Sequence, residues 1–146
     1  MRTAADLVKT KRHQTVYTIG PNASALDAVR MLVQHDIGAL VVVEGERVVG
    51  VVSERDCARK IIPASRAAAD TPVRDIMSAE VMVIHPGQTS AECMALMTDS
   101  RLRHLPVMDG SRLLGLVSIG DLVKDIISDQ TFTIQQLEHY ITGDRG

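Results

Sequence analysis

The feature that most constrains this 146-residue chain is an internal repeat. Shifting the sequence against itself by 65 residues aligns Val16–Ile61 with Val81–Ile126 without a gap, and 12 of the 46 aligned pairs are identical. The identical pairs include Gly50 with Gly115, and ten of the other pairs exchange one of Ala, Val, Leu, Ile or Met for another. A register kept over that length indicates a duplicated unit, so the chain is expected to fold as two similar halves.

Each half contains the same order of predicted elements. A short extended segment ends at a proline, and a helix follows it. Two apolar strands come next, joined by a turn whose glycine suits a tight hairpin, and a second helix closes the unit. The strands are apolar without alternation, which predicts a sheet covered on both faces. We therefore predict an α/β (α+β) fold of two β-α-β-β-α units. The three extended segments and the closing helix are expected at 16–19, 39–43, 47–52 and 54–62 in the first unit, and at 81–84, 104–108, 112–117 and 119–127 in the second.

The first helix of each unit begins with a Ser/Thr-x-x-Asp/Glu pattern, which is typical of a capping box. Apolar residues at helical spacing then predict one buried face. The capping pairs are Ser24 with Asp27 and Thr89 with Glu92, and the apolar face of the first helix is predicted to contain Ala25, Ala28, Val29, Leu32 and Val33.

The sequence divides into a first domain with an N-terminal segment (1–65), a linker (66–72), a second domain (73–129) and a C-terminal helix (130–146). Within the two domains, Asp75-Ile76-Met77 resembles Asp6-Leu7-Val8 at an offset of 69. Thr133–Gly143 is interpreted as a separate short amphipathic helix that ends at Gly143. Such a helix needs the body of the protein or a second subunit to pack on.

The composition argues against several classes of function. The net charge is −2 and aromatic residues make up 2% of the chain, which disfavours nucleic-acid binding. No apolar run approaches the ~18 residues of a membrane span. Two cysteines, Cys57 and Cys93, indicate a reducing, cytoplasmic setting. Four basic residues near the start are interpreted as a solvated face: Arg2, Lys9, Lys11 and Arg12.

Two segments at equivalent repeat positions share a pattern of glycine, two aliphatic residues, serine, two variable residues and aspartate: Gly50–Asp56 and Gly115–Asp121. This pattern, with Arg103-His-Leu-Pro-Val107, resembles the cystathionine-β-synthase-type (CBS) domain family over roughly residues 5–128. The resemblance implies a Bateman module, in which two repeats pack sheet to sheet about a pseudo-two-fold axis. It also implies two clefts for adenosine-containing ligands such as AMP, ADP, ATP or NAD(H), and a homodimer.

The resemblance assigns candidate ligand-binding residues. An ionised carboxylate can accept both hydroxyls of a ribose, which is the role expected for Asp56 and Asp121. Taken alone, Ser-x-x-Asp is equally a helix cap, and both roles can coexist. The remaining candidates are Ser53 and Ser118 for ribose or phosphate, Arg55, Arg103 and His104 for phosphate, Gly38 and Ala39 for close backbone approach, and Val16 and Val81 beside adenine. Arg55, Arg103 and His104 can alternatively be ordinary surface or packed residues.

These observations predict a regulatory sensor that signals to a separate, unknown partner protein. The sequence contains no CxxC, HExxH or P-loop motif, so we expect no enzyme activity, no catalytic cofactor and no metal ligands. The alternatives are a structural dimerisation module with empty clefts and, less favoured, a nucleic-acid binder. Because basic residues precede only one of the two equivalent strands, two unequal clefts are expected, and Asp121→Ala is expected to weaken nucleotide binding more than Asp56→Ala.

Overall fold

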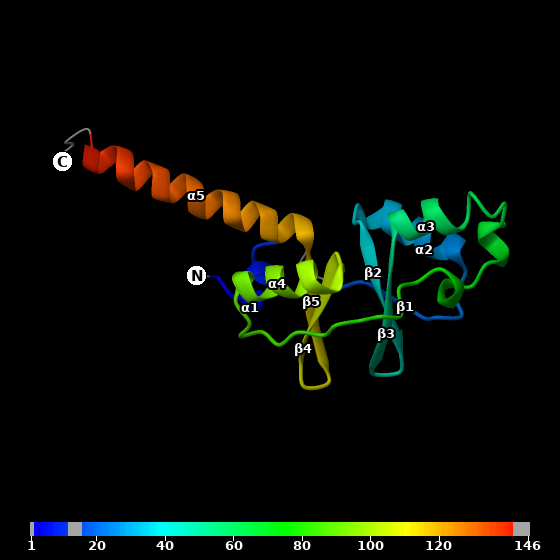
Figure 1. Cartoon of the computed structure of the whole chain (residues 1–146). Coiled ribbons are helices and arrows are strands. Elements are labelled where there is room, and N and C mark those ends of the chain that lie inside the picture. Colours follow the sequence, from blue (N-terminus) through cyan, green and yellow to red (C-terminus); the bar gives the residue numbers. More distant parts are fainter. Residues whose placement is uncertain (1, 12–15, 142–146) are drawn as a thin grey trace.

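The computed structural model describes residues 2–11 and 16–141. Two β-hairpins lie side by side at the centre, with helices on the outer sides and one long helix extending away from the body (Figure 1). The elements are α1 (Ala4–Lys9), β1 (Thr18–Ile19), α2 (Ala25–His35), β2 (Ala39–Glu44), β3 (Arg47–Ser53), α3 (Glu54–Lys60), the 3₁₀ turns η1 (Ala68–Asp70) and η2 (Val73–Asp75), α4 (Ser90–Ser100), β4 (His104–Asp109), β5 (Arg112–Ser118) and α5 (Ile119–Ile141).

The duplication predicted from the sequence is visible in the backbone. Strands β2 and β3 pair antiparallel, as do β4 and β5, and each hairpin carries an irregularity at the same place, Val42/Val43 and Val107/Met108. The turn glycines Gly45 and Gly110 have φ values of 63° and 62°, the left-handed conformation that glycine adopts without a steric penalty. Two small sheets with helices outside confirm the predicted α+β class.

Each repeat has its own hydrophobic core, and the strands supply its centre. Leu40 and Val42 in the first repeat and Leu105 and Val107 in the second are completely buried in these cores. Val41, which points to the opposite face of β2, is completely buried as well, as expected for a strand covered on both faces. The predicted apolar face of α2 is correct for Ala25, Ala28 and Leu32, which are buried, but wrong for Val33, which is 75% exposed. Val33 lies about 100° around the helix from Leu32, beyond the stripe that reaches the core.

Each core is completed by the segment that precedes the other repeat. Ala4 and Leu7 of α1 are buried in the second core, against residues that include Ile84 and Leu122. Val73 and Ile76, which follow the linker, are buried in the first core. Each short segment therefore packs into the core of the repeat that it does not directly precede.

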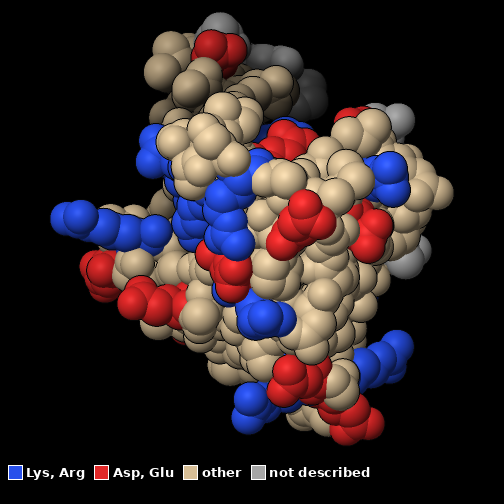
Figure 2. All heavy atoms as spheres, turned by 90° about the vertical axis from the view of Figure 1, so that its right-hand side faces the viewer, with Lys and Arg blue, Asp and Glu red and all other residues tan. Residues whose placement is uncertain are grey.

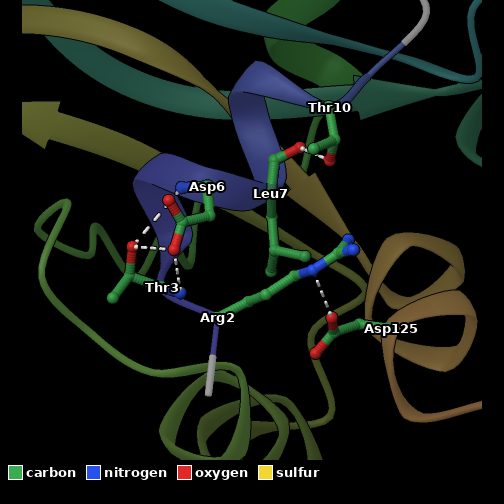
Figure 3. Close-up of polar contacts among 6 residues, drawn as sticks. All are labelled: Arg2, Thr3, Asp6, Leu7, Thr10 and Asp125. Atoms are coloured by element: carbon green, nitrogen blue, oxygen red, sulfur yellow. Dashed lines mark hydrogen bonds and ion pairs between the residues drawn. The ribbon is translucent and has the colours of Figure 1, made fainter. Parts of the chain in front are cut away.

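Backbone hydrogen bonds hold these exchanged segments at equivalent places. Ala4 N donates to Gln88 O at 2.7 Å, and Val73 N donates to Ala23 O at 2.8 Å. The segment from Thr3 to Lys9 also forms a capping box between Thr3 and Asp6, a pattern that the sequence reasoning did not identify (Figure 3). These bonds follow the offset of 69 expected from the resemblance of the two segments.

The glycines that open the repeated motif lie directly beneath the exchanged segments. A Cβ at Gly115 would stand 2.6 Å from Cγ1 of Val8, and a Cβ at Gly50 would stand 2.6 Å from Sδ of Met77. Val8 and Met77 are equivalent at the offset of 69. The two glycines are therefore small because a side chain of the exchanged segment occupies the space above each of them.

Two local predictions are corrected. The first strand is only Thr18–Ile19, and its counterpart in the second repeat is a single parallel bridge between Ile84 and Val107. The predicted separate C-terminal helix is instead the second half of α5, which runs without a break from Ile119 to Ile141. No glycine or proline interrupts it after Gly120, so nothing in the sequence ends the helix at residue 128. The predicted stop at Gly143 lies outside the described residues.

The basic N-terminal residues are not simply a solvated face. Nε of Arg2 lies 3.3 Å from Oδ1 of Asp125 on α5, whose side chain is 1% exposed (Figure 3). Lys11 pairs with another carboxylate of α5, and Arg12 lies outside the described residues. Among the described helices, none is long and apolar enough to cross a membrane.

Candidate nucleotide-binding clefts

The repeated serine and aspartate form matching caps at the starts of α3 and α5. Ser53 N donates to Asp56 Oδ2 at 2.9 Å and Asp56 N donates to Ser53 Oγ at 3.2 Å. The equivalent distances are 2.8 Å and 3.1 Å for Ser118 and Asp121. The capping interpretation is thus correct for both pairs. A carboxylate offers about four lone-pair sites, so the cap leaves acceptor capacity for a ligand.

One cleft between the repeats encloses about 460 Å³. We call it the Ser53 cleft. It joins the end of β3 and the start of α3 to the start of β4, and its wall includes the predicted residues Ser53, Arg55, Asp56, Val81, Arg103, His104 and Gly38, together with Ser78, Glu80 and Arg101.

The second cleft encloses about 320 Å³, and we call it the Ser118 cleft. It joins the end of β5 to the start of β2. Asp121 borders it through its bond to Ser118 N and an ion pair with Lys11. Its wall includes the predicted residues Val16, Gly38, Ala39, His104 and Ser118, together with Val8, Lys11, Tyr17 and Leu116.

Each cleft combines the serine of one repeat with the strand start of the other. Ser53 of the first repeat shares a wall with Arg103 of the second, and Ser118 of the second shares a wall with Ala39 of the first. His104 and Gly38 line both clefts, so they stand where the two meet. The predicted site residues therefore gather at the junction of the repeats, in two crossed sets.

The arginines concentrate in the Ser53 cleft. Arg55, Arg101 and Arg103 all line it, and the Arg103 guanidinium is the main cause of a lowered pKa at Arg55, followed by Arg59. Like charges held this close repel each other, and a bound anion would relieve the repulsion. Three carboxylates, Glu54, Asp56 and Glu80, line the same cleft, so its wall carries both signs of charge.

His104 is largely buried, and desolvation lowers its pKa, with a further contribution from Lys11. Because this pKa lies below the ordinary value of 6.5, the imidazole is neutral at physiological pH, and it offers a hydrogen bond rather than a full charge. Its expected role as a cation for phosphate is thereby reduced.

The cleft residues that the sequence did not identify include Tyr17, Arg101 and Lys11. Tyr17 lines the Ser118 cleft with its ring stacked on His35 at a centroid distance of 3.7 Å. Arg101 lies at the end of α4, and Lys11 follows α1. The repeat relates Lys11 to a residue of the other cleft. At the offset of 69, Lys11 is equivalent to Glu80, and the two residues line equivalent positions of the two clefts.

A duplicated α+β unit with paired clefts at the junction defines a tandem-repeat ligand-binding module. The family model of the CBS domain matches residues 5–63 and 73–128, so the chain belongs to the CBS-domain family and carries two CBS domains in tandem. This confirms the resemblance inferred from the repeated motif.

Named relatives agree with this assignment. The chain is 41% identical over 122 residues to the mitochondrial CBS domain-containing protein CBSX3 of Arabidopsis thaliana, covering 80% of this chain and 59% of that protein. The chain thus spans little more than half the length of that relative.

Solved structures show the same fold. A protein with CBS domains from Burkholderia ambifaria superposes with a TM-score of 0.80 at 48% identity, covering 88% of this chain and 96% of that one. The CBS domain pair of MJ0100, solved in complex with 5′-methylthioadenosine and S-adenosyl-L-methionine, superposes with a TM-score of 0.76 at 21% identity, covering 88% and 98%. At that identity the second match supports the fold alone.

Proposed function

We propose that this protein is a regulatory sensor that binds an adenosine-containing ligand in the clefts between its CBS domains and signals to a separate partner protein. The observation that carries the proposal is the crossed arrangement of the Ser-x-x-Asp pairs. Ser53 and Asp56 line one cleft. Ser118 lines the other, with Asp121 hydrogen-bonded to Ser118 and paired with Lys11 beside it, and each serine lies opposite a strand start from the other repeat. The volumes of about 460 and 320 Å³ are within the usual range of ligand pockets. The ligands of the MJ0100 domain pair, both adenosine derivatives, belong to the same chemical class.

The two clefts are proposed to bind differently. Arg55, Arg101 and Arg103 equip the Ser53 cleft for the phosphates of AMP, ADP, ATP or NAD(H), while Asp56 accepts the ribose hydroxyls. The Ser118 cleft has the smaller volume and lacks these arginines. For ligands with two or three phosphates, we therefore replace the ranking expected from sequence and expect Asp56→Ala to weaken binding more than Asp121→Ala.

The proposed mode of action is binding without turnover. Burial raises the pKa of both Cys57 and Cys93, which makes each thiol a poor nucleophile. A reducing, cytoplasmic setting is part of this proposal. A ligand in a cleft between two repeats can bias how the repeats pack, and a partner or a second subunit can respond to that change.

A structural dimerisation module is the second candidate, and the exposed apolar side chains of α5 favour it. Ile134, Leu137 and Ile141 lie at helical spacing on one side of α5 and are each more than half exposed. A homodimer that covers this face is compatible with the sensor proposal, because dimerisation and ligand binding use different surfaces.

Nucleic-acid binding has less support. On the face seen from the side of the first repeat, groups of Lys and Arg alternate with groups of Asp and Glu, without one continuous basic surface (Figure 2). The net charge of −2 points the same way.

The test is a thermal-shift panel of AMP, ADP, ATP, NAD, NADH, S-adenosylmethionine and GMP, followed by calorimetry. A ligand at one hundred times its Kd should add about 2.7 kcal/mol of stability. Stabilisation by adenosine ligands and not by GMP, with the ligand recovered unchanged after incubation, supports the sensor. No stabilisation by any member would contradict it and favour the dimerisation module.

A further inference from the structure

Lys11 occupies the acceptor groups that a ribose would need in the Ser118 cleft. Its Nζ lies 3.0 Å from Oδ2 of Asp121 and donates a hydrogen bond to the carbonyl oxygen of Leu116 at 2.6 Å. The side chains of Lys11 and Asp121 are 29% and 19% exposed, so both charges are largely removed from water. The ion pair offsets the charge of the carboxylate.

A ligand that binds Asp121 through its ribose hydroxyls competes with this ammonium. If the ammonium is displaced, a half-buried charge loses its partner, which is costly unless another anion replaces the carboxylate. Among the described residues that line the Ser118 cleft, Lys11 is the one Lys or Arg, and the neutral His104 does not compete for an anion. A phosphate on the ligand would therefore find its cationic partner in Lys11.

The Ser53 cleft is built differently. The position equivalent to Lys11 is Glu80, and Asp56 pairs instead with Lys60, one turn along α3, at 3.3 Å. Lys60 does not line the Ser53 cleft, where arginines supply the positive charge. In the described part of the chain, a cation that both lines the cleft and forms an ion pair with the ribose acceptor is found in the Ser118 cleft, as Lys11, but not in the Ser53 cleft.

We propose that Lys11 is the selectivity residue of the Ser118 cleft, which makes this cleft prefer 5′-phosphorylated adenosine to adenosine. The inference rests on the proposed function. Adenosine must displace the ammonium and leave it unpaired, whereas AMP displaces it from Asp121 and provides a phosphate in its place. Lys11 thus opposes the neutral ligand and favours the anionic one.

The experiment compares AMP and adenosine by isothermal titration calorimetry in the Asp56→Ala background, which isolates the Ser118 cleft. With Lys11 present, AMP is expected to bind roughly tenfold more tightly than adenosine, since a charge-assisted hydrogen bond contributes at this level. Lys11→Met keeps the apolar stem and removes the charge. It is expected to tighten adenosine binding about threefold and weaken AMP binding about fivefold, so that the preference nearly disappears.

Lys124→Met is the matched control. Lys124 is an exposed residue of α5 outside both clefts, and its loss removes the same charge from the chain. The preference for AMP should be unchanged in that variant. Circular dichroism of each variant checks that the fold is kept.

Lys11→Met is expected to tighten adenosine binding and to weaken AMP binding. This opposite effect on the two ligands distinguishes a failure of the role assigned to Lys11 from a failure of the proposed function. If adenosine and AMP weaken equally in Lys11→Met, or if the preference for AMP persists, the role of Lys11 is refuted while nucleotide binding stands. If Asp56→Ala abolishes all binding, the Ser118 cleft holds no nucleotide and the inference is also refuted. Absence of binding to the unmutated protein refutes the proposed function itself.

Discussion

The close approach of α1 to Gly115 gives a prediction whose size can be worked from distances. Alanine at this position would place its Cβ 2.6 Å from Cγ1 and 2.7 Å from Cγ2 of Val8. Non-bonded carbons are most stable at about 3.5–4.0 Å, so α1 would have to move by about 1 Å. The backbone at Gly115 is outside the left-handed region, so it accepts alanine without strain, and the clash with Val8 is the dominant penalty.

Overpacking of this kind costs about 1–3 kcal/mol, and Gly→Ala recovers about 0.4–1 kcal/mol by restricting the unfolded chain. We expect Gly115→Ala to lower the free energy of unfolding by about 1–2 kcal/mol. In a chain of this length each kcal/mol corresponds to about 2–4 °C in Tm. In a Val8→Ala background, which leaves only Cβ of residue 8 at 3.2 Å, the same substitution is expected to cost less than about 0.5 kcal/mol.

Urea unfolding of the four proteins in this double-mutant cycle gives the coupling energy directly. Equal destabilisation by Gly115→Ala in both backgrounds would refute the role assigned to Val8. Gly50→Ala provides an internal comparison. Its Cβ would meet Sδ of Met77 at 2.6 Å but also the backbone oxygen of Ser78 at 2.8 Å. Met77→Ala should therefore rescue Gly50→Ala less completely.

Two further predictions concern charged groups. Within the described part of the chain neither oxygen of Asp125 accepts a hydrogen bond, and Arg2 supplies its ion pair, so Arg2→Ala should destabilise the protein by about 1–2 kcal/mol. In an Asp125→Leu background, Arg2→Ala should have little further effect. Equal costs of Arg2→Ala with and without Asp125 would contradict the ion pair. For His104, the lowered pKa means that the unfolded chain binds a proton more readily than the folded one, so stability falls as the pH drops below about 6.5. His104→Gln should flatten this part of the stability–pH curve in urea unfolding between pH 4 and 8, and an unchanged slope would count against burial as the cause.

The parts of the fold that could be predicted from sequence are those fixed by local chemistry. Gly45 and Gly110 predict the hairpins because a tight turn needs a left-handed residue. The Ser-x-x-Asp pairs predict helix starts because the serine oxygen and the backbone N–H meet at that spacing. The repeat offset then transfers each prediction from one half to the other, which is why the two predicted hairpins could be placed to within a residue or two.

The rest depended on contacts between distant segments. Nothing in the spacing of Ala4 and Leu7 shows that they close the core of the second repeat rather than the first. For the same reason the sequence named Arg103, Asp56 and Asp121 as ligand residues but did not show that Arg103 and Asp56 share a cleft. Lys11 was misinterpreted because a basic residue near a chain end is usually solvated, and its partner Asp121 lies far along the chain.

The exchange of short segments between the repeats has a consequence for the order of folding. During synthesis the first core gains its last pieces, Val73 and Ile76, soon after its own strands have emerged. The second core, in contrast, needs α1, which is synthesised long before β4 and β5. The contact between Lys11 and the Leu116 carbonyl spans 105 residues and cannot form until β5 has been synthesised. Long closures of this kind carry more loop entropy and slow the folding rate. We therefore expect the docking of residues 2–11, and with it the Ser118 cleft, to be among the last steps by which this chain becomes native.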